Sequence, residues 1–281
     1  MAVTLDRDLL SRYRRFTLYN SPFAAHDRGC AVDLYPDPET GVAVSPVAGE
    51  VLEVRQVRAP PKPYAAEHDY LLLIDTGEHV ARLLHVDPAV ETGERVAVGD
   101  SLGGLVRAGF FAPWVPNHIH LGFRPRGANQ YRAAGSLPLE PGVEPRPLDW
   151  DGTGTVVEAG DTWARLDEPE HPAPGECFVG LDGGGGVLDG GVPHYQGGGL
   201  LGDGSPDPVE RDAVDIAGTA VGTVRDRTVA WHDCTVLANN DPVRGLALFC
   251  ARDVFGVKLV GETVDLDVGE QVTVTVERTG T

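Results

Sequence analysis

The chain has 281 residues, of which 42% are hydrophobic, enough to bury the cores of two ordinary domains or of one large all-β domain. Its formal net charge of −19 argues against a nucleic-acid partner, because phosphates are bound by basic surfaces. No apolar run approaches the roughly 18 residues that a membrane span requires, so no membrane association is expected.

Helical periodicity is confined to Leu5–Phe16, where we expect a short amphipathic lead-in. Beyond it, short apolar or alternating runs bounded by Gly, Pro and Asp are typical of an all-β protein. The strands expected in this half are Ala31–Tyr35, Gly41–Ser45, Glu50–Val57, Tyr70–Thr76, Val80–Val86, Arg95–Val98, Ser101–Leu105 and His118–Arg124. We therefore expect a first β domain over residues 1–130.

Residues 131–175 are rich in proline, which regular structure tolerates poorly, and are expected to form a linker. Residues 176–281 then predict a smaller, glycine-rich β domain. Its dense Gly180–Gly204 segment lacks the lysine of a phosphate-binding loop and is expected to be a flexible or tight-turn loop. Later strands are expected at Ala213–Val224, Thr228–Leu237, Gly245–Ala251, Val254–Leu259 and Val272–Glu277.

The clearest chemical signal is His118-Ile119-His120. In a strand, side chains two positions apart share a face, so the two imidazoles project together. They can serve one zinc ion, or one can bind metal while the other acts as a base. By itself the pattern is weak, because two unrelated histidines produce it by chance.

Its context is more specific. Upstream lie His26, the sequence A-V-D at residues 31–33 within the expected strand Ala31–Tyr35, a turn over Ser45–Val51, and His85 after two leucines. Residues 90–103 then read V-E-T-G-E-R-V-A-V-G-D-S-L-G. This ordered series resembles the lysostaphin/LytM-type zinc peptidases that cleave peptidoglycan cross-links, over roughly residues 20–126.

The resemblance implies a duplicated-hybrid-motif or barrel-sandwich-like fold. It also implies that His26, Asp33 and His120 bind Zn²⁺, with His118 as general base and His85 stabilising the oxyanion. The residues themselves suit that chemistry, because a catalytic zinc takes three protein ligands and keeps one position open for water. The implied substrate is a peptide, often Gly-rich.

One spacing departs from the family. Its first ligand pair usually reads H-x-x-x-D, whereas His26 and Asp33 are seven positions apart and Gly29 occupies the usual ligand position. An odd spacing in a regular strand points the two side chains to opposite faces. A bulge or loop at residues 27–30 must therefore turn His26 round, which Gly29 permits. The competing interpretation is a surface-loop histidine with weak or no metal binding.

Two other function classes stay open. One is a non-catalytic module that binds metal or peptide on the same fold. The other is a carrier domain of the biotinyl, lipoyl or phosphotransferase kind, whose opening hairpin Ser45–Val51 resembles. A lipoyl-type carrier requires a modifiable lysine at a hairpin tip, and neither Lys62 nor Lys258 stands in such a motif.

The acidic surface is also lysine-poor, because Lys62 and Lys258 are the only lysines among 23 basic residues. This composition resembles that of proteins from salt-in halophiles, especially haloarchaea, with an ordinary acidic protein of a GC-rich organism as the alternative. The first residues do not read as a signal peptide, which predicts a cytoplasmic protein. The four cysteines are scattered and are expected to be free thiols.

Overall fold

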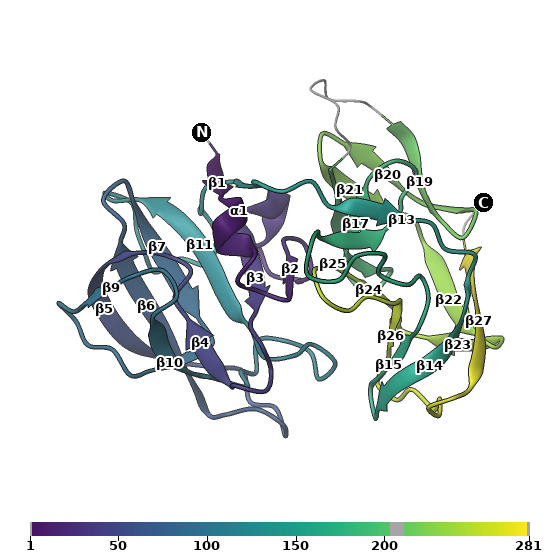
Figure 1. Ribbon diagram of the computed structural model, residues 1–281, viewed down its shortest axis with the longest axis horizontal. Helices are drawn as coiled ribbons and strands as arrows, with labels where there is room; N and C mark the ends of the chain where they lie inside the picture. The colour runs from purple at the N-terminus through teal and green to yellow at the C-terminus, as the bar shows by residue number, and fades with distance from the viewer. Residues whose placement is uncertain (1, 203–210, 280–281) are drawn as a thin grey trace. The chain divides into compact units, whose positions relative to one another are not determined.

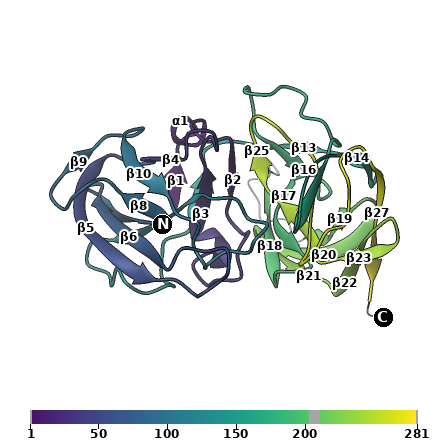
Figure 2. The same ribbon diagram turned by 90° about the horizontal axis from the view of Figure 1, so that it is seen from below.

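A computed structural model describes residues 2–202 and 211–279 (Figures 1 and 2). The protein is all-β and divides into two compact units. Unit 1 comprises residues 1–16 and 23–142, and unit 2 comprises residues 17–22 and 143–281. Both β domains expected from the sequence are therefore present. Among the described residues, no helix is long and apolar enough to span a bilayer.

Unit 1 contains all eight of the expected strands, two of them, Ala31–Tyr35 and Ser101–Leu105, with the expected bounds. Its elements are β1 (Val3–Leu5), α1 (Arg7–Leu10), β2 (Arg15–Thr17), the 3-10 helix η1 (Asp27–Gly29), β3 (Ala31–Tyr35), β4 (Val42–Val44), β5 (Gly49–Arg58), β6 (His68–Asp75), β7 (His79–Leu84), β8 (Val86–Pro88), β9 (Arg95–Val96), β10 (Ser101–Leu105), β11 (Ile119–Pro125) and β12 (Leu139–Pro141). The helical lead-in is shorter than expected, because only α1 is helical and strands flank it on both sides.

Two sheets build the barrel-sandwich-like body of this unit. One runs in the order β3-β11-β7-β6-β5-β9, with every neighbouring pair antiparallel, and the other in the order β4-β10-β8. Leu72, Leu83 and Ile119 of the first sheet and Val86 and Leu102 of the second are fully buried. The strands that carry the candidate site residues, β3, β11 and the end of β7, lie side by side in the first sheet.

Unit 2 is a single long antiparallel sheet with additional short strands. Its elements are β13 (Arg146–Leu148), β14 (Thr153–Gly160), β15 (Trp163–Leu166), β16 (Val179–Leu181), β17 (Val187–Val192), β18 (Gly197–Leu201), β19 (Arg211–Ile216), β20 (Thr219–Arg225), β21 (Thr228–Trp231), β22 (Cys234–Ala238), β23 (Asp241–Val243), β24 (Gly245–Leu248), β25 (Cys250–Ala251), β26 (Lys258–Val260) and β27 (Gln271–Arg278). The long sheet runs β19-β20-β21-β18-β17-β24-β26-β15-β14-β27-β22-β23 and curls into a half-barrel (Figure 2).

The segment 131–175 is not the linker that its prolines predict, because it carries β12 to β15. The prolines are accommodated where a missing N–H does little harm. Pro141 ends β12, and Pro147 lies in β13, which pairs on one side only, with β16. Proline is tolerated at such edges. The second domain therefore begins near residue 143 rather than 176.

The glycine-dense segment also differs from expectation, because β17 and β18 lie within it. Its last residue, Gly204, lies outside the described residues. A Cβ on Gly199 would overlap the Tyr19 ring, and one on Gly198 would overlap the Trp231 ring. Glycine is needed there because aromatic rings pack directly on the strand backbone, and this contact is not visible in local sequence.

Replacing Gly199 with alanine should destabilise unit 2, because the added methyl group must displace the Tyr19 ring. Tyr19 is held in place, since the buried Asp189 carboxylate accepts the backbone N–H groups of Leu18 at 2.5 Å and of Tyr19 at 3.2 Å. Overpacking of this kind costs about 1–3 kcal/mol, measured by denaturant unfolding. Gly104→Ala is the control, because nothing lies within 4 Å of its Cβ position. Equal stability of both variants would contradict the tight contact.

The four cysteines, Cys30, Cys177, Cys234 and Cys250, are free, as the sequence predicts.

Candidate metal centre

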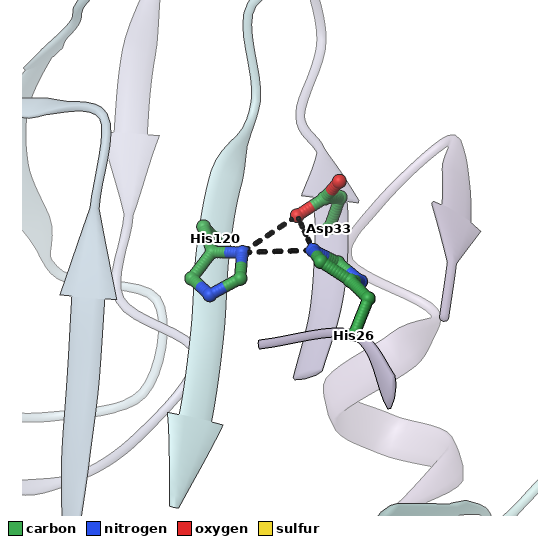
Figure 3. A group of neighbouring side chains, drawn as sticks. All are labelled: His26, Asp33 and His120. Atoms are coloured by element: carbon green, nitrogen blue, oxygen red, sulfur yellow. Dashed lines mark hydrogen bonds and ion pairs between the residues drawn. The ribbon is translucent and has the colours of Figure 1, made fainter. Parts of the chain in front are cut away.

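Three of the candidate site residues converge at one point in unit 1 (Figure 3). Asp33 lies in β3 and His120 in β11, and these two residues face each other in the antiparallel register of the two strands. The pairing therefore places the carboxylate and the imidazole at adjacent positions on one face of the sheet. Within the part of the chain that the structure describes, His26, Asp33 and His120 are the only group of His, Cys, Asp or Glu with metal-ligand spacing.

His26 reaches this point through the turn at residues 27–30. It is the residue immediately before η1, and the backbone there turns left-handed at Arg28 (φ 56°) and Gly29 (φ 64°). Two successive left-handed residues reverse the chain direction, so the odd spacing between His26 and Asp33 no longer separates their side chains. A left-handed glycine carries little steric cost, which accounts for Gly29 at this position.

The three donor atoms form a nearly equilateral triangle. Nδ1 of His120 lies 3.0 Å from Oδ1 of Asp33 and 3.1 Å from Nε2 of His26, and Nε2 of His26 lies 3.3 Å from Oδ1 of Asp33. Three donors bound tetrahedrally to one zinc ion at about 2.0–2.1 Å would lie about 3.3 Å apart. One cation bound by all three atoms accounts for all three short distances at once, whereas directional N–H hydrogen bonds cannot form along all three. The donor set therefore fits a zinc ion.

His118 lies beside this triangle, at the residue immediately before β11. Its Nδ1 donates to the carbonyl oxygen of Pro116 at 2.8 Å, which leaves the lone pair on Nε2 when the ring is neutral. Nε2 lies 3.5 Å from Oδ2 of Asp33, the carboxylate oxygen that faces away from the triangle. The ring is thus oriented as a proton acceptor at the edge of the site.

His85 completes the group and depends on a residue that sequence reasoning missed. Its ring centroid lies 5.0 Å from that of His118 and 5.9 Å from that of His120. Nδ1 of His85 lies 2.6 Å from Oδ2 of Asp69, and the backbone N–H of His85 donates to Oδ1 of the same carboxylate at 2.9 Å. Asp69 is fully buried and also accepts the N–H of Tyr70.

The backbone of His85 is in the left-handed region (φ 70°), where a non-glycine residue costs about 1–3 kcal/mol. Asp69 stabilises this conformation by holding both the backbone and the ring. Backbone strain of this kind is common at functional sites, and it persists only where the surrounding structure maintains it. In the sequence, Asp69 follows Glu67 and His68 in a polar stretch, and no local signal distinguishes the buried carboxylate from its exposed neighbours.

Burial sets the protonation of the site. It lowers the pKa of His118 to about 3 and that of His120 to about 4, despite the favourable charge of Asp33. Burial by itself would raise the pKa of Asp33, but the imidazoles of His118 and His26 and hydrogen bonds from His120 and His26 hold it well below its usual value. At neutral pH the site therefore offers an ionised carboxylate and neutral His118 and His120 rings, the forms that bind metal.

Acid should destabilise the metal-free protein through these rings. In the unfolded chain a histidine has a pKa near 6.5. Between pH 6.5 and about 4, His118 and His120 are therefore protonated in the unfolded state but not in the folded state. Stability is therefore lost as pH falls through this window, by about 2–3 kcal/mol per ring at pH 4.5. His118→Gln should show a smaller drop in melting temperature between pH 7 and 4.5.

The matched control is His68→Gln, because the His68 side chain is 43% exposed. That variant should keep the full acid sensitivity. An unchanged drop in His118→Gln would mean that the His118 ring titrates in the folded protein as it does in water.

The remaining histidines lie elsewhere. His79 packs against Phe123, with ring centroids 6.5 Å apart, and His68 begins strand β6 rather than lying in a loop, with its side chain 43% exposed. In unit 2, the half-buried His194 ring lies 4.4 Å from the Tyr195 ring, centroid to centroid, and burial, together with the charge of Arg244, lowers the pKa of His194 to about 4. Neither it nor His232 joins a group with metal-ligand spacing among the described residues.

Comparison with known proteins gives a family but no activity. Residues 4–141 match the N-terminal domain of DUF8155, a domain of unknown function, and residues 146–277 match the DUF8155 C-terminal domain. No curated protein and no solved structure matches the chain. The two matches follow one another in order and leave few residues outside them, so the chain belongs to the DUF8155 family.

Proposed function

We propose that the protein is a zinc-dependent metalloendopeptidase-like hydrolase of the lysostaphin/LytM type. The observation that carries the proposal is the triangle of His26, Asp33 and His120, whose edges of 3.0, 3.1 and 3.3 Å match the donor spacing of a tetrahedral zinc site. Two nitrogen donors and one carboxylate are a usual ligand set for catalytic zinc. A fourth position would remain for water or substrate.

When bound, zinc would supply a water molecule of lowered pKa and polarise the substrate carbonyl. His118 would accept a proton from that water, since its Nε2 carries the lone pair while Nδ1 is held by the Pro116 carbonyl. Burial keeps this ring neutral at working pH, as a base requires. The same ring can return the proton to the leaving amine.

His85 would stabilise the negative charge that develops on the oxygen of the reacting carbonyl. Asp69 fixes the orientation of the ring through Nδ1 and leaves Nε2 as the nitrogen that can meet substrate. Since the carboxylate holds both backbone and ring, the imidazole needs little reorganisation during the reaction. Asp69 is therefore a positioning residue.

The substrate class follows from the chemistry of the groups. A zinc ion held by His26, Asp33 and His120 would supply the activated water, and the neutral His118 base beside it would suit hydrolysis of an unactivated amide, as the resemblance to cross-link endopeptidases implies. We propose a peptide substrate, and a Gly-rich peptide is the first to try.

The direct test is hydrolysis of peptides by the full chain in high salt, with added zinc and with a chelator. We expect cleavage that the chelator abolishes and that zinc restores. If every peptide tried, Gly-rich or otherwise, stays intact while the protein binds about one zinc per chain, the hydrolase proposal fails.

One observation favours a second candidate, a non-catalytic metal- or peptide-binding module. His26, Asp33, His85, His118 and His120 are all between 2% and 6% exposed, so the site is deep for a hydrolytic centre. Stoichiometric zinc without chelator-sensitive cleavage is the result expected of that module. Cleavage lost on chelation excludes it.

A further inference from the structure

Two phenylalanine rings lie next to the imidazoles that the proposed function uses, and a third packs against one of the two. The Phe111 ring centroid lies 4.6 Å from that of His118 and 5.1 Å from that of His85. Phe110 lies 6.1 Å from His85, and Phe23 stands edge-on to Phe110 at 6.2 Å. We call Phe23, Phe110 and Phe111 the aromatic wall.

The aromatic wall is accessible where the imidazoles are not. Phe23 is 43% exposed, and Phe110 and Phe111 are partly exposed, whereas His85 and His118 are buried. Apolar rings that adjoin one another at the surface are unfavourable in water and are typical of binding sites, unlike single scattered apolar residues. The wall thus extends outward from the proposed reacting groups to solvent.

The loop that carries Phe110 and Phe111 is held in place by hydrogen bonds to its backbone carbonyl oxygens. The Arg107 guanidinium donates to the carbonyl oxygens of Ala112, Pro113 and Val115, and it lies 4.8 Å from the centroid of the Phe111 ring. The hydroxyl of Tyr64 donates to the carbonyl oxygen of Phe111 at 3.0 Å. A surface that is already ordered loses little entropy on binding, which favours recognition over incidental exposure.

We propose that the aromatic wall binds a large apolar side chain, best an aromatic one, of a peptide whose scissile carbonyl lies at His118 and His85. The inference rests on the proposed function and specifies its substrate class. A run of glycines offers no side chain to cover the rings, so the wall distinguishes this protein's substrate from the Gly-rich peptide that the family resemblance implies. Aromatic rings also pair favourably with one another beyond the area that they bury.

The test compares two blocked peptides that differ at one position, Gly-Gly-Gly-Gly-Gly and Gly-Gly-Phe-Gly-Gly, with the zinc-loaded full chain. We expect kcat/KM to be about tenfold or more higher for the peptide that contains phenylalanine. Phe23→Ala and Phe111→Ala should each reduce that ratio toward one. Val268→Ala, which removes an exposed apolar side chain from unit 2, should leave the ratio unchanged.

A ratio near one in the wild type would overturn the inference, as would a ratio that survives both phenylalanine substitutions. Binding of the same two peptides, measured by calorimetry, separates this failure from failure of the hydrolase proposal. Suppose that neither peptide is cleaved, but the phenylalanine peptide binds about tenfold more tightly than the glycine peptide and Phe23→Ala loses this difference. The aromatic wall is then supported as a binding site, while the hydrolase proposal fails. Equal binding then overturns both.

Discussion

Replacing His120 with alanine should deprive the protein of zinc. The proposed site has three protein ligands, and His120 contributes the nitrogen that lies closest to both of the others, 3.0 Å from Asp33 and 3.1 Å from His26. Loss of residues that only support metal ligands weakens binding about 10- to 100-fold, so loss of a ligand should exceed about 100-fold. Metal analysis of purified protein should give about one zinc per wild-type chain and none in the variant.

The informative companion is His26→Ala, because the spacing between His26 and Asp33 departs from the H-x-x-x-D spacing of the lysostaphin/LytM-type family. It should also lose zinc if the turn at Arg28 and Gly29 delivers the ring as the geometry indicates. His68→Ala, which removes an exposed imidazole, is the control and should keep full zinc. If His26→Ala retains zinc, the third ligand must be a residue other than His26. If His120→Ala retains zinc, the proposed metal site is wrong.

Alternation of residues predicts much of unit 1. Ala31–Tyr35 and Ser101–Leu105 are strands with the predicted bounds, because Pro36 follows the first and a turn containing Gly99 precedes the second. The pattern His118-Ile119-His120 predicts two imidazoles on one face. What alternation does not contain is register, and it is the pairing of Asp33 with His120 across β3 and β11 that brings the triangle together. From the sequence, the meeting of Asp33 and His120 is only an expectation that the resemblance to the lysostaphin/LytM-type peptidases implies.

The parts that could not be predicted depend on contacts between distant residues. Asp69 belongs to the site only because β6 and β7 are neighbours, so that its carboxylate lies beneath His85. Strands β17 and β18 lie in the glycine-rich stretch that ends at Gly202 in the described residues, and Tyr19, far away in the chain, packs on Gly199 of β18. Composition alone predicts a loop there. In both cases the decisive partner is absent from any local window of sequence.

His118→Gln should remove activity while leaving the metal in place. The nitrogen of His118 that faces the proposed ligands lies 3.5 Å from the outer oxygen of Asp33, and the ring takes no part in the triangle of donor atoms. Its proposed task is to accept the proton of the attacking water, which glutamine cannot do, and loss of a general base lowers kcat by about 10²- to 10⁴-fold. Zinc content and KM should change little, because neither depends on that proton transfer.

Asp69→Asn should give a smaller loss, about 10- to 100-fold in kcat, because His85 remains but its ring and backbone are no longer held by a carboxylate. His79→Gln, whose ring packs against Phe123, should retain wild-type kinetics. If His118→Gln loses zinc, the His118 imidazole is a fourth zinc ligand and no coordination position is left for water. Full activity in the same variant would leave the proposed mechanism without its base.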